Sequence, residues 1–378
     1  MRAFLFHPIL AVIIPFGIVL LFQSNMTDFP YYKYYQDSKE TIIFLIIIPF
    51  VLTFLIIRLF ILLSPKKTYQ LRLRGAKNTN ILHLFFILSI LEIFLFGGLP
   101  MLNVLFGLPS GYERFGLPTL HGFVNMLFFL VTIEQFIYKQ HSSNFKLKAF
   151  IFIWPILVVS RGMLMIVILL YLIGKLHNKK LKITRIIIMY LIIFISIFFL
   201  FGFIGEYRTR DFNLVSAMGL PEGTNIFTLW LYVYMVSPIA NLQNTINATS
   251  IEPLYSLKHT LDPLVPSVLK GLLTFDSSFG HSSGEVVHSF LNASTGFMAP
   301  YLDYGVNGII ALNIFYGVLA ALIYSRRTYR DGGLLTMFNV LMILNIFNIN
   351  FFALTFLILL IYLAIKERRW IANDQSNY

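Results

Sequence analysis

Residues 149–174 read AFIFIWPILVVSRGMLMIVILLYLIG, and this apolar stretch decides the fold. It is long enough for one membrane-spanning helix, but lysines flank both ends and Arg161 lies in its middle. A single span would leave one basic flank outside, against the positive-inside rule, and an arginine at mid-bilayer is costly. We therefore predict two short helices, each reaching roughly 18 Å, that meet at Ser160-Arg161-Gly162. Their turn would lie in a protein-lined or watery cavity open to the outside, where non-helical backbone is tolerated.

Other apolar runs of about 20 residues, the length that crosses a bilayer, surround this hairpin. The predicted spans are Phe4–Phe22, Thr41–Leu63, Ile81–Leu99, Leu120–Tyr138, Ile183–Ile204 and Tyr301–Tyr324. A second hairpin is predicted in Leu334–Ile365, with its turn near Asn345–Asn350, because basic residues again flank both ends. The expected fold is an all-α polytopic membrane protein of about ten membrane segments, in one domain over residues 1–378.

The composition excludes an ordinary soluble domain. Of the 378 residues, 57% are hydrophobic and 12% are charged, whereas soluble domains are roughly 45–50% apolar and about 25% charged. The formal net charge is +12, but most basic residues lie beside apolar runs, so membrane topology explains them better than a nucleic-acid partner. The chain has no cysteine, which excludes disulfides, thiol chemistry and cysteine metal sites.

The basic residues also predict an orientation in the membrane. The strongest basic run, residues 66–77, follows the second span, so we place it in the cytoplasm and the first loop outside. Both chain ends are then cytoplasmic, and residues 205–300 form one large external loop region. Within it, Ile226–Ile239 is predicted to be an amphipathic helix that lies on the membrane or dips into it. No small-residue cleavage site follows the first apolar run, so we expect that helix to be retained.

A few arginines lie outside under this topology, where positive charge is disfavoured. Arg208 and Arg210 follow the span that precedes the large loop, and Arg114 lies in the loop after the third span. Guanidinium groups donate paired hydrogen bonds that match phosphate oxygens, so we predict that these arginines bind a pyrophosphate-linked lipid. The alternative is that Arg208 and Arg210 form salt bridges with Glu206 and Asp211 or contact ordinary lipid head groups.

Arg161 is the sharpest functional candidate, because an ionisable residue at membrane depth is a functional-site hypothesis by default. Glu92, inside the third span, is a candidate partner for it. The alternative role of Arg161 is structural, as one half of an Arg161–Glu92 bond that locks the helices together.

In the large loop, His281, Glu285 and His288 are spaced by four and three residues, which would put them on one helical face. Histidine can act as a general base near neutral pH, and a neighbouring carboxylate can orient it. We therefore predict that His281 is catalytic and that Glu285 and His288 contact substrate. Two alternatives stay open: a metal site, although the order of residues is not that of a known metalloprotease, and a polar face turned to water.

Three further polar residues lie where the chain returns to the membrane: Asn292, Tyr301 and Asp303. Their side chains can hydrogen-bond the hydroxyl groups of a sugar. We predict that they bind substrate.

Several of these elements resemble the Wzy polymerases, which join O-antigen or oligosaccharide repeat units. The resemblance is carried by Ser160-Arg161-Gly162 between two short apolar runs and by the outer-loop sequence Tyr207-Arg208-Thr209-Arg210. It continues in Asn292-Ala-Ser-Thr295, in Tyr301-Leu-Asp303-Tyr-Gly305-Val-Asn-Gly308 and in Gly317. It covers roughly residues 149–330, and its motifs are short.

The resemblance implies a C-type glycosyltransferase architecture acting on the periplasmic face of the bacterial inner (cytoplasmic) membrane. Such an enzyme moves a growing chain onto a new repeat unit carried on undecaprenyl pyrophosphate, for polysaccharides such as the O-antigen of lipopolysaccharide. Arg161, Arg208 and Arg210 could stabilise the charge on the leaving phosphate. His281, Glu285 or Asp303 could take the proton of the acceptor hydroxyl.

The expected partners are the lipid-linked oligosaccharide, membrane lipid and a chain-length regulator protein, with no metal, cofactor or nucleic acid. Two other functions stay open, a flippase for lipid-linked sugars and an O-antigen ligase. A flippase would favour a charged central cavity and repeated halves, and the sequence has no internal repeat. A ligase would have a similar layout but a lipid A acceptor.

Overall fold

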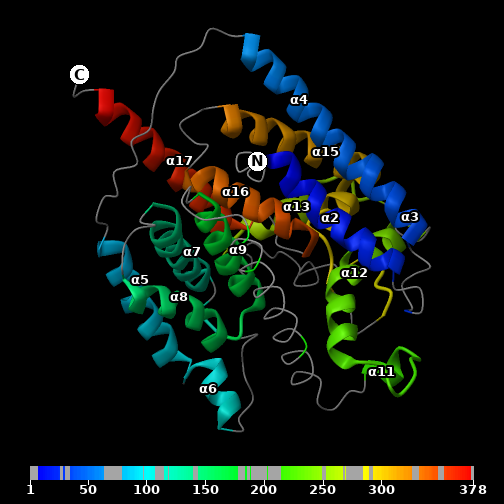
Figure 1. Cartoon of the computed structure of the whole chain (residues 1–378), viewed down its shortest axis with the longest axis horizontal. Helices are drawn as coiled ribbons and strands as arrows, with labels where there is room; N and C mark the ends of the chain where they lie inside the picture. The colour runs from blue at the N-terminus through cyan, green and yellow to red at the C-terminus, as the bar shows by residue number, and fades with distance from the viewer. Residues whose placement is uncertain are drawn as a thin grey trace.

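The computed structural model describes residues 7–25, 29, 35–63, 79–96, 98–106, 115–117, 119–138, 144–177, 184, 188, 202, 214–248, 253–266, 269, 284–288, 293–325, 332–347 and 353–375. All regular structure in these ranges is helical (Figure 1). Six helical segments among them are long and apolar enough to cross a membrane: Pro8–Asn25, Asp37–Leu63, Asn80–Asn103, Leu120–Tyr138, Ile226–Asn247 and Met298–Ser325. The prediction of a polytopic helical membrane protein is confirmed at this level.

Most predicted spans coincide with helices. They correspond to α2 (Pro8–Asn25), η2 (Thr41–Ile47) with α4 (Ile48–Leu63), α5 (Thr79–Leu95), α7 (Leu120–Ile133) with η4 (Glu134–Tyr138), and α15 (Met298–Ser325). Helices α4 and α5 expose large apolar side chains, among them Phe60 and Phe94, which lipid rather than water accommodates. Most of the predicted span Ile183–Ile204 lies outside the described residues.

The hairpin predicted for residues 149–174 is present. Helix α8 (Phe145–Leu157) and helix α9 (Arg161–His177) pack against each other and are joined by a short turn. Val159 in the turn has a positive φ of 55°, and the hydroxyl of Ser160 accepts a hydrogen bond from the Met163 amide at 3.4 Å. The chain therefore reverses direction immediately before Arg161, as the flanking lysines predicted.

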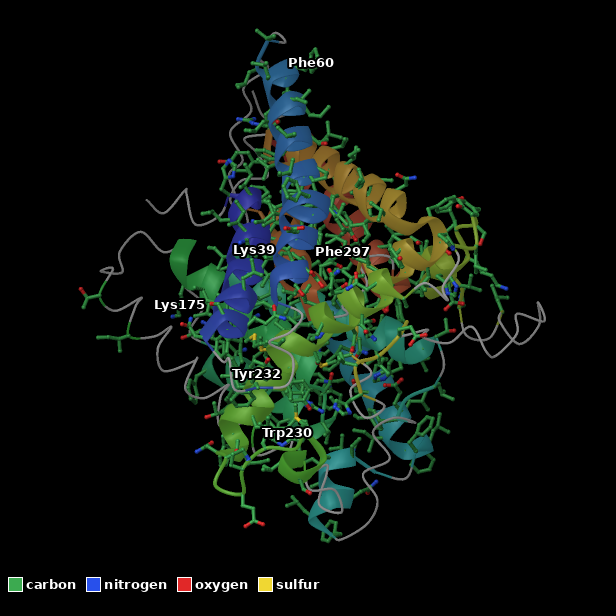
Figure 2. The ribbon with its side chains drawn as sticks, turned by 90° about the vertical axis from the view of Figure 1, so that its right-hand side faces the viewer. Lys39, Phe60, Lys175, Trp230, Tyr232 and Phe297 are labelled. Atoms are coloured by element: carbon green, nitrogen blue, oxygen red, sulfur yellow. The ribbon has the colours of Figure 1, made fainter. Side chains whose placement is uncertain are left out.

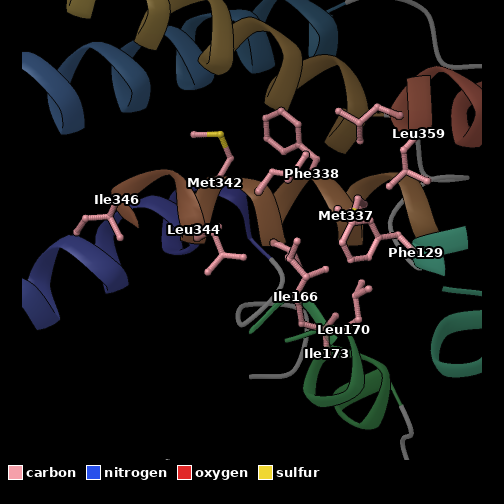
Figure 3. Close-up of a cluster of buried hydrophobic side chains, with 14 of the residues drawn as sticks. Phe129, Ile166, Leu170, Ile173, Met337, Phe338, Met342, Leu344, Ile346 and Leu359 are labelled. Carbon is pink, nitrogen blue, oxygen red and sulfur yellow. The ribbon is translucent and has the colours of Figure 1, made fainter. Parts of the chain in front are cut away.

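The second hairpin is also present, as α16 (Gly333–Leu344), η8 (Asn345–Phe347) and α17 (Leu354–Gln375). Every residue from Gly333 to Met342 is buried, which marks a helix enclosed on all sides. Helix α16 contacts α2, α9, α15 and α17. Figure 3 shows its apolar side chains beside those of α9 and α17. It is the central helix of the described bundle.

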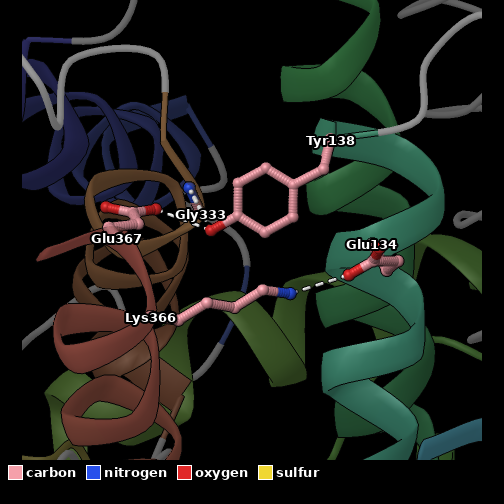
Figure 4. A network of polar contacts seen from close by, with 5 residues as sticks. All are labelled: Glu134, Tyr138, Gly333, Lys366 and Glu367. Atoms are coloured by element: carbon pink, nitrogen blue, oxygen red, sulfur yellow. Dashed lines mark hydrogen bonds and ion pairs between the residues drawn. The ribbon is translucent and has the colours of Figure 1, made fainter. Parts of the chain in front are cut away.

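A polar network ties this hairpin to the end of the fourth span (Figure 4). Lys366 pairs with Glu134, with 2.8 Å between Nζ and Oε2, and both side chains are about nine-tenths buried. The Tyr138 hydroxyl donates to Glu367 Oε1 at 2.6 Å, and the same oxygen accepts the Leu334 amide at 3.1 Å. The network thereby satisfies an amide at the start of α16 and holds α17 against η4.

Helix α15 packs along α4, and small residues allow the close approach. A Cβ atom at Gly317 would lie 2.9 Å from the Phe50 carbonyl oxygen, so only glycine fits there without a shift. Near its start α15 is kinked at Tyr304 and Gly305, and Gly305 has a φ of 61° that favours glycine. The kink marks the part of α15 that meets the loop region.

Helix α12 (Ile226–Asn247) differs from the amphipathic helix predicted over Ile226–Ile239. It continues to Asn247, and residues on all its sides are buried between Val236 and Gln243, so the amphipathic prediction is wrong. Figure 2 shows Trp230 and Tyr232 on this helix. The first part of α12 packs with the short helix α11 (Leu214–Ala217) in a second apolar cluster, separate from the main core.

Candidate functional site

Arg161 lies at the tip of the α8–α9 hairpin, as the first residue of α9, and is half-buried. Its guanidinium carbon lies 4.6 Å from the centre of the Tyr234 ring, and Nη1 donates a hydrogen bond to the Tyr234 hydroxyl. The Tyr234 ring is stacked on Trp230, with 5.5 Å between centroids and 24° between planes. A cation over an aromatic face is stabilised by the ring quadrupole, so α12 supplies an aromatic support for Arg161.

Arg161 lines a cavity of about 200 Å³ between segments that are far apart in the sequence. The walls come from α9, α12, the segment before α15, and the end of α16 with the turn η8 that follows it. The lining residues are Arg161, Gly162, Met165, Leu231, Tyr234, Met235, Pro238, Ala293, Leu344 and Phe347. Apart from the guanidinium and the Tyr234 hydroxyl, these side chains are apolar. A cavity with one fixed cation in an apolar wall suits an anionic group attached to an apolar or amphipathic molecule.

The structural alternative for Arg161, a bond to Glu92, does not form. Glu92 is 1% exposed and faces His121 instead, with 3.2 Å between Oε2 and the histidine Nδ1. The contacts of Arg161 with Tyr234 hold it at the cavity. The prediction that Glu92 is the partner of Arg161 is therefore wrong.

Glu285 and His288 lie in a segment that α12 holds through its polar side chains. The Glu285 amide donates to Thr245 Oγ1 at 2.9 Å, and the Glu285 carbonyl accepts from Asn244 at 3.0 Å. Asn241 accepts the Val287 amide at 2.8 Å. Residues 284–288 form bends rather than a helix, and Gly284 has a φ of 65°. The helical face predicted from the spacing is therefore wrong for Glu285 and His288; Glu285 is exposed and His288 half-buried.

Tyr301 and Asp303 lie in the first turns of α15 and have structural contacts. The Tyr301 hydroxyl lies 3.4 Å from the Ile246 carbonyl at the end of α12. Asp303 is fully buried, and its two carboxylate oxygens accept the amides of His259 and Thr260 at 2.9 and 2.7 Å. These amides open the short helix α13 (Lys258–Leu261), which precedes η5 (Asp262–Leu264). Asp303 thus caps α13 and fastens the loop region to α15.

We expect Asp303→Asn to lower stability by about 1–3 kcal/mol, because the new amide group turns a donor toward a buried backbone N–H. The thermal midpoint of the detergent-purified protein measures this, with Glu222→Gln, at an exposed carboxylate, as the control. An unchanged midpoint with a raised substrate KM would instead support the predicted sugar-binding role.

Arg114, Arg208, Arg210, His281 and Asn292 all lie outside the described residues. Ala293, the neighbour of Asn292, lines the Arg161 cavity. Among the described residues, no three His, Cys, Asp or Glu side chains gather into a group that could hold a metal ion.

Sequence reasoning missed Tyr234 and His121. Trp230 and Tyr234 are four residues apart, the spacing of neighbours on a helix face, and this signal could have paired the two rings. No local signal identifies Arg161 as their partner, since it lies 73 positions away. Comparisons with protein-family models, with curated proteins and with solved structures found no match.

Proposed function

We propose that this chain is a membrane glycosyltransferase that joins oligosaccharide repeat units carried on undecaprenyl pyrophosphate, as a Wzy-type polymerase. The observation that carries the proposal is that Arg161 and Ala293 line one cavity. Arg161 and Gly162 belong to the motif Ser160-Arg161-Gly162, and Ala293 belongs to the distant motif Asn292-Ala-Ser-Thr295, yet the three residues share this wall. The contact of residues from both motifs with one cavity supports a shared site.

The chemistry of the cavity suits the leaving group of this reaction. The acceptor hydroxyl oxygen attacks the anomeric carbon, the bond from that carbon to the pyrophosphate oxygen breaks, and the electron pair stays on the pyrophosphate. A positive, preorganised group at the place where negative charge develops stabilises such a transition state. Arg161 offers its guanidinium there, and Tyr234 and Trp230 restrict its movement. The apolar remainder of the wall fits the lipid-linked part of the substrate.

The proposal is tested with purified protein in vesicles that contain lipid-linked repeat units. We expect a ladder of products that differ by one repeat unit. Transfer only to lipid A core would instead identify a ligase, and movement of the unit across the vesicle membrane without chain growth would identify a flippase. In cells, loss of the protein should leave lipopolysaccharide with a single repeat unit; complete loss of capped lipopolysaccharide would point to the ligase.

The proposed site must face the outside of the inner membrane, and this gives a topological prediction. The second turn and the last residue of α12 contact the segment between α2 and α4: Tyr232 lies 4.5 Å from Phe29 between ring centres, and Asn247 donates to Asp37 at 3.3 Å. Since that segment is assigned to the outside, we expect both ends of α12 to be external.

Reporter fusions near Glu222 and His259, on either side of α12, should therefore both read external. Fusions after Lys77, Lys180, Arg330 and Arg369 should read cytoplasmic. A cytoplasmic reading at Glu222 together with an external reading at His259 would mean that α12 crosses the membrane, and would contradict the proposed orientation.

A further inference from the structure

A second cavity, about 1030 Å³ in volume, has His121 in its wall, and this histidine contacts the buried carboxylate of Glu92. Its lining combines aromatic rings with a few polar groups, among them Phe96, Phe123, Thr119, His121 and Thr355. A large, mostly apolar cavity with a few convergent polar groups is the usual form of a small-molecule site. We infer that this cavity receives the acceptor sugar, that His121 is the general base of the transfer and that Glu92 is its positioning residue; the inference rests on the proposed function.

The geometry of the pair fits this role. Glu92 is 1% exposed, whereas the His121 side chain is 32% exposed, so the carboxylate lies behind the imidazole as seen from the cavity. In the proposed role the Glu92 carboxylate accepts a hydrogen bond from Nδ1 of a neutral His121 across the 3.2 Å contact, and Nε2 is left as the acceptor. The pair therefore presents an accepting nitrogen, backed by a buried negative charge that stabilises the imidazolium formed on proton transfer.

Two features support a role for the pair beyond that of a core contact. The second carboxylate oxygen of Glu92, Oε1, is buried and has no hydrogen-bond partner among the described residues, so His121 at Oε2 is the one described polar contact of the Glu92 side chain. Packing also sets the orientation of the imidazole: Phe115 meets it edge-on at 5.6 Å, and a Cβ atom at Gly116 would lie 2.4 Å from the ring. A positioned ring in front of a buried carboxylate is the arrangement that acid–base catalysis requires.

His121 and Arg161 start neighbouring helices that run in the same direction. Helices α7 and α9 contact each other, and Gly174 of α9 touches the Phe136 carbonyl of η4 near their other ends. At about 1.5 Å per residue, His121 lies roughly 22 Å and Arg161 roughly 20 Å from that contact along their helices. The two side chains are thus at a similar depth, at the same end of the bundle.

The α16–α17 hairpin contributes lining residues to both cavities. Leu344 and Phe347 line the Arg161 cavity, whereas Ala353 and Thr355 line the His121 cavity. This placement suits a reaction with two substrates, the donor pyrophosphate at Arg161 and the acceptor at His121. In the transfer, the hydroxyl proton passes to Nε2 of His121 while the new bond from the acceptor oxygen to the anomeric carbon forms and the pyrophosphate leaves with its electron pair.

The test uses the full-length protein in vesicles with lipid-linked repeat units. We expect His121→Gln to lower kcat by about 100-fold or more, the contribution of a general base, with little change in KM and a normal thermal midpoint. Glu92→Gln should lower kcat in the same way, and the double variant should be no slower than His121→Gln alone, because paired residues act as a unit. His83→Gln, at an exposed histidine on α5, is the matched control and should keep full activity.

The outcomes separate the two proposals. If the wild type extends chains and His121→Gln keeps full activity, only the role of the His121–Glu92 pair is overturned, and the proposed function stands. The role of the pair is also overturned if the fold-losses in kcat of the two single variants multiply in the double variant. Absence of chain growth in the wild type would overturn the proposed function itself. If Glu92→Gln lowers the yield of folded protein, His121→Gln decides the question, since its side chain reaches into the cavity.

Discussion

Arg161→Ala should reduce chain polymerisation by roughly 100- to 1000-fold, while the protein remains inserted at normal abundance. The size of the effect follows from the loss of one donor to a developing anion, which typically costs about 2.7–4 kcal/mol in the transition state. The rate of chain growth in vesicles, divided by the amount of folded protein, measures it. Arg161→Lys keeps the charge but loses the planar guanidinium, so it should restore activity only in part.

The chain contains a matched control for this variant. Arg58 of α4 also lies over a tyrosine, with its guanidinium carbon 5.2 Å from the centre of the Tyr324 ring, and it donates to the Ser325 hydroxyl at 3.0 Å. It does not line the Arg161 cavity. Arg58→Ala removes the same kinds of contact, so it should leave the activity of the folded protein unchanged. Equal losses of activity in both variants would contradict a specific role for Arg161.

Variants of Tyr234 distinguish the support that its ring gives to Arg161 from the catalytic effect of Arg161 itself. Tyr234→Phe keeps the ring beneath the guanidinium and removes only the hydroxyl, so we expect a loss of activity well below that of Arg161→Ala. Tyr234→Leu removes the aromatic face as well and should cost more, because a cation–π contact contributes about 0.5–2 kcal/mol. If both variants behave like the wild type, the aromatic support has no part in the reaction.

Gly174→Ala should destabilise the protein by about 3 kcal/mol or more, at the upper end of the range for overpacking. A Cβ atom at this position of α9 would lie 2.3 Å from the Phe136 carbonyl oxygen. The obstacle is backbone rather than the end of a flexible side chain, so the helices must move apart. Loss of the α9–η4 contact would show as a lower thermal midpoint in detergent and a smaller yield of monodisperse protein.

The same substitution at Gly17 is the matched control. Gly17 lies inside α2, and a Cβ atom there has nothing within 4 Å. Alanine is favoured over glycine in a helix by about 0.5–1 kcal/mol, so Gly17→Ala should leave stability unchanged or raise it slightly. A midpoint that falls equally in both variants would mean that helix flexibility, and not the close approach to Phe136, makes Gly174 necessary.

The sequence by itself determined five of the spans and both hairpins. Apolar run length and flanking basic residues are local properties, and the physical limits on a chain in lipid act on them directly. For that reason Leu120–Tyr138 was predicted to the residue, and the turns before Arg161 and after Leu344 lie where the lysine and arginine flanks require them.

Only the tertiary structure decided which polar groups meet. Arg161 contacts Tyr234 rather than Glu92, and Glu92 faces His121, because α5 packs against α7 and the start of α9 meets α12 at Tyr234; no local period relates these residues. Spacing in the large loop predicted a helical face at Glu285, but the side chains of α12 bind that backbone and Gly284 bends it. The hydrophobic pattern of a sequence predicts whether a residue faces lipid or the core. The partner of a buried charge, however, depends on distances between helices that are set only when the helices have packed.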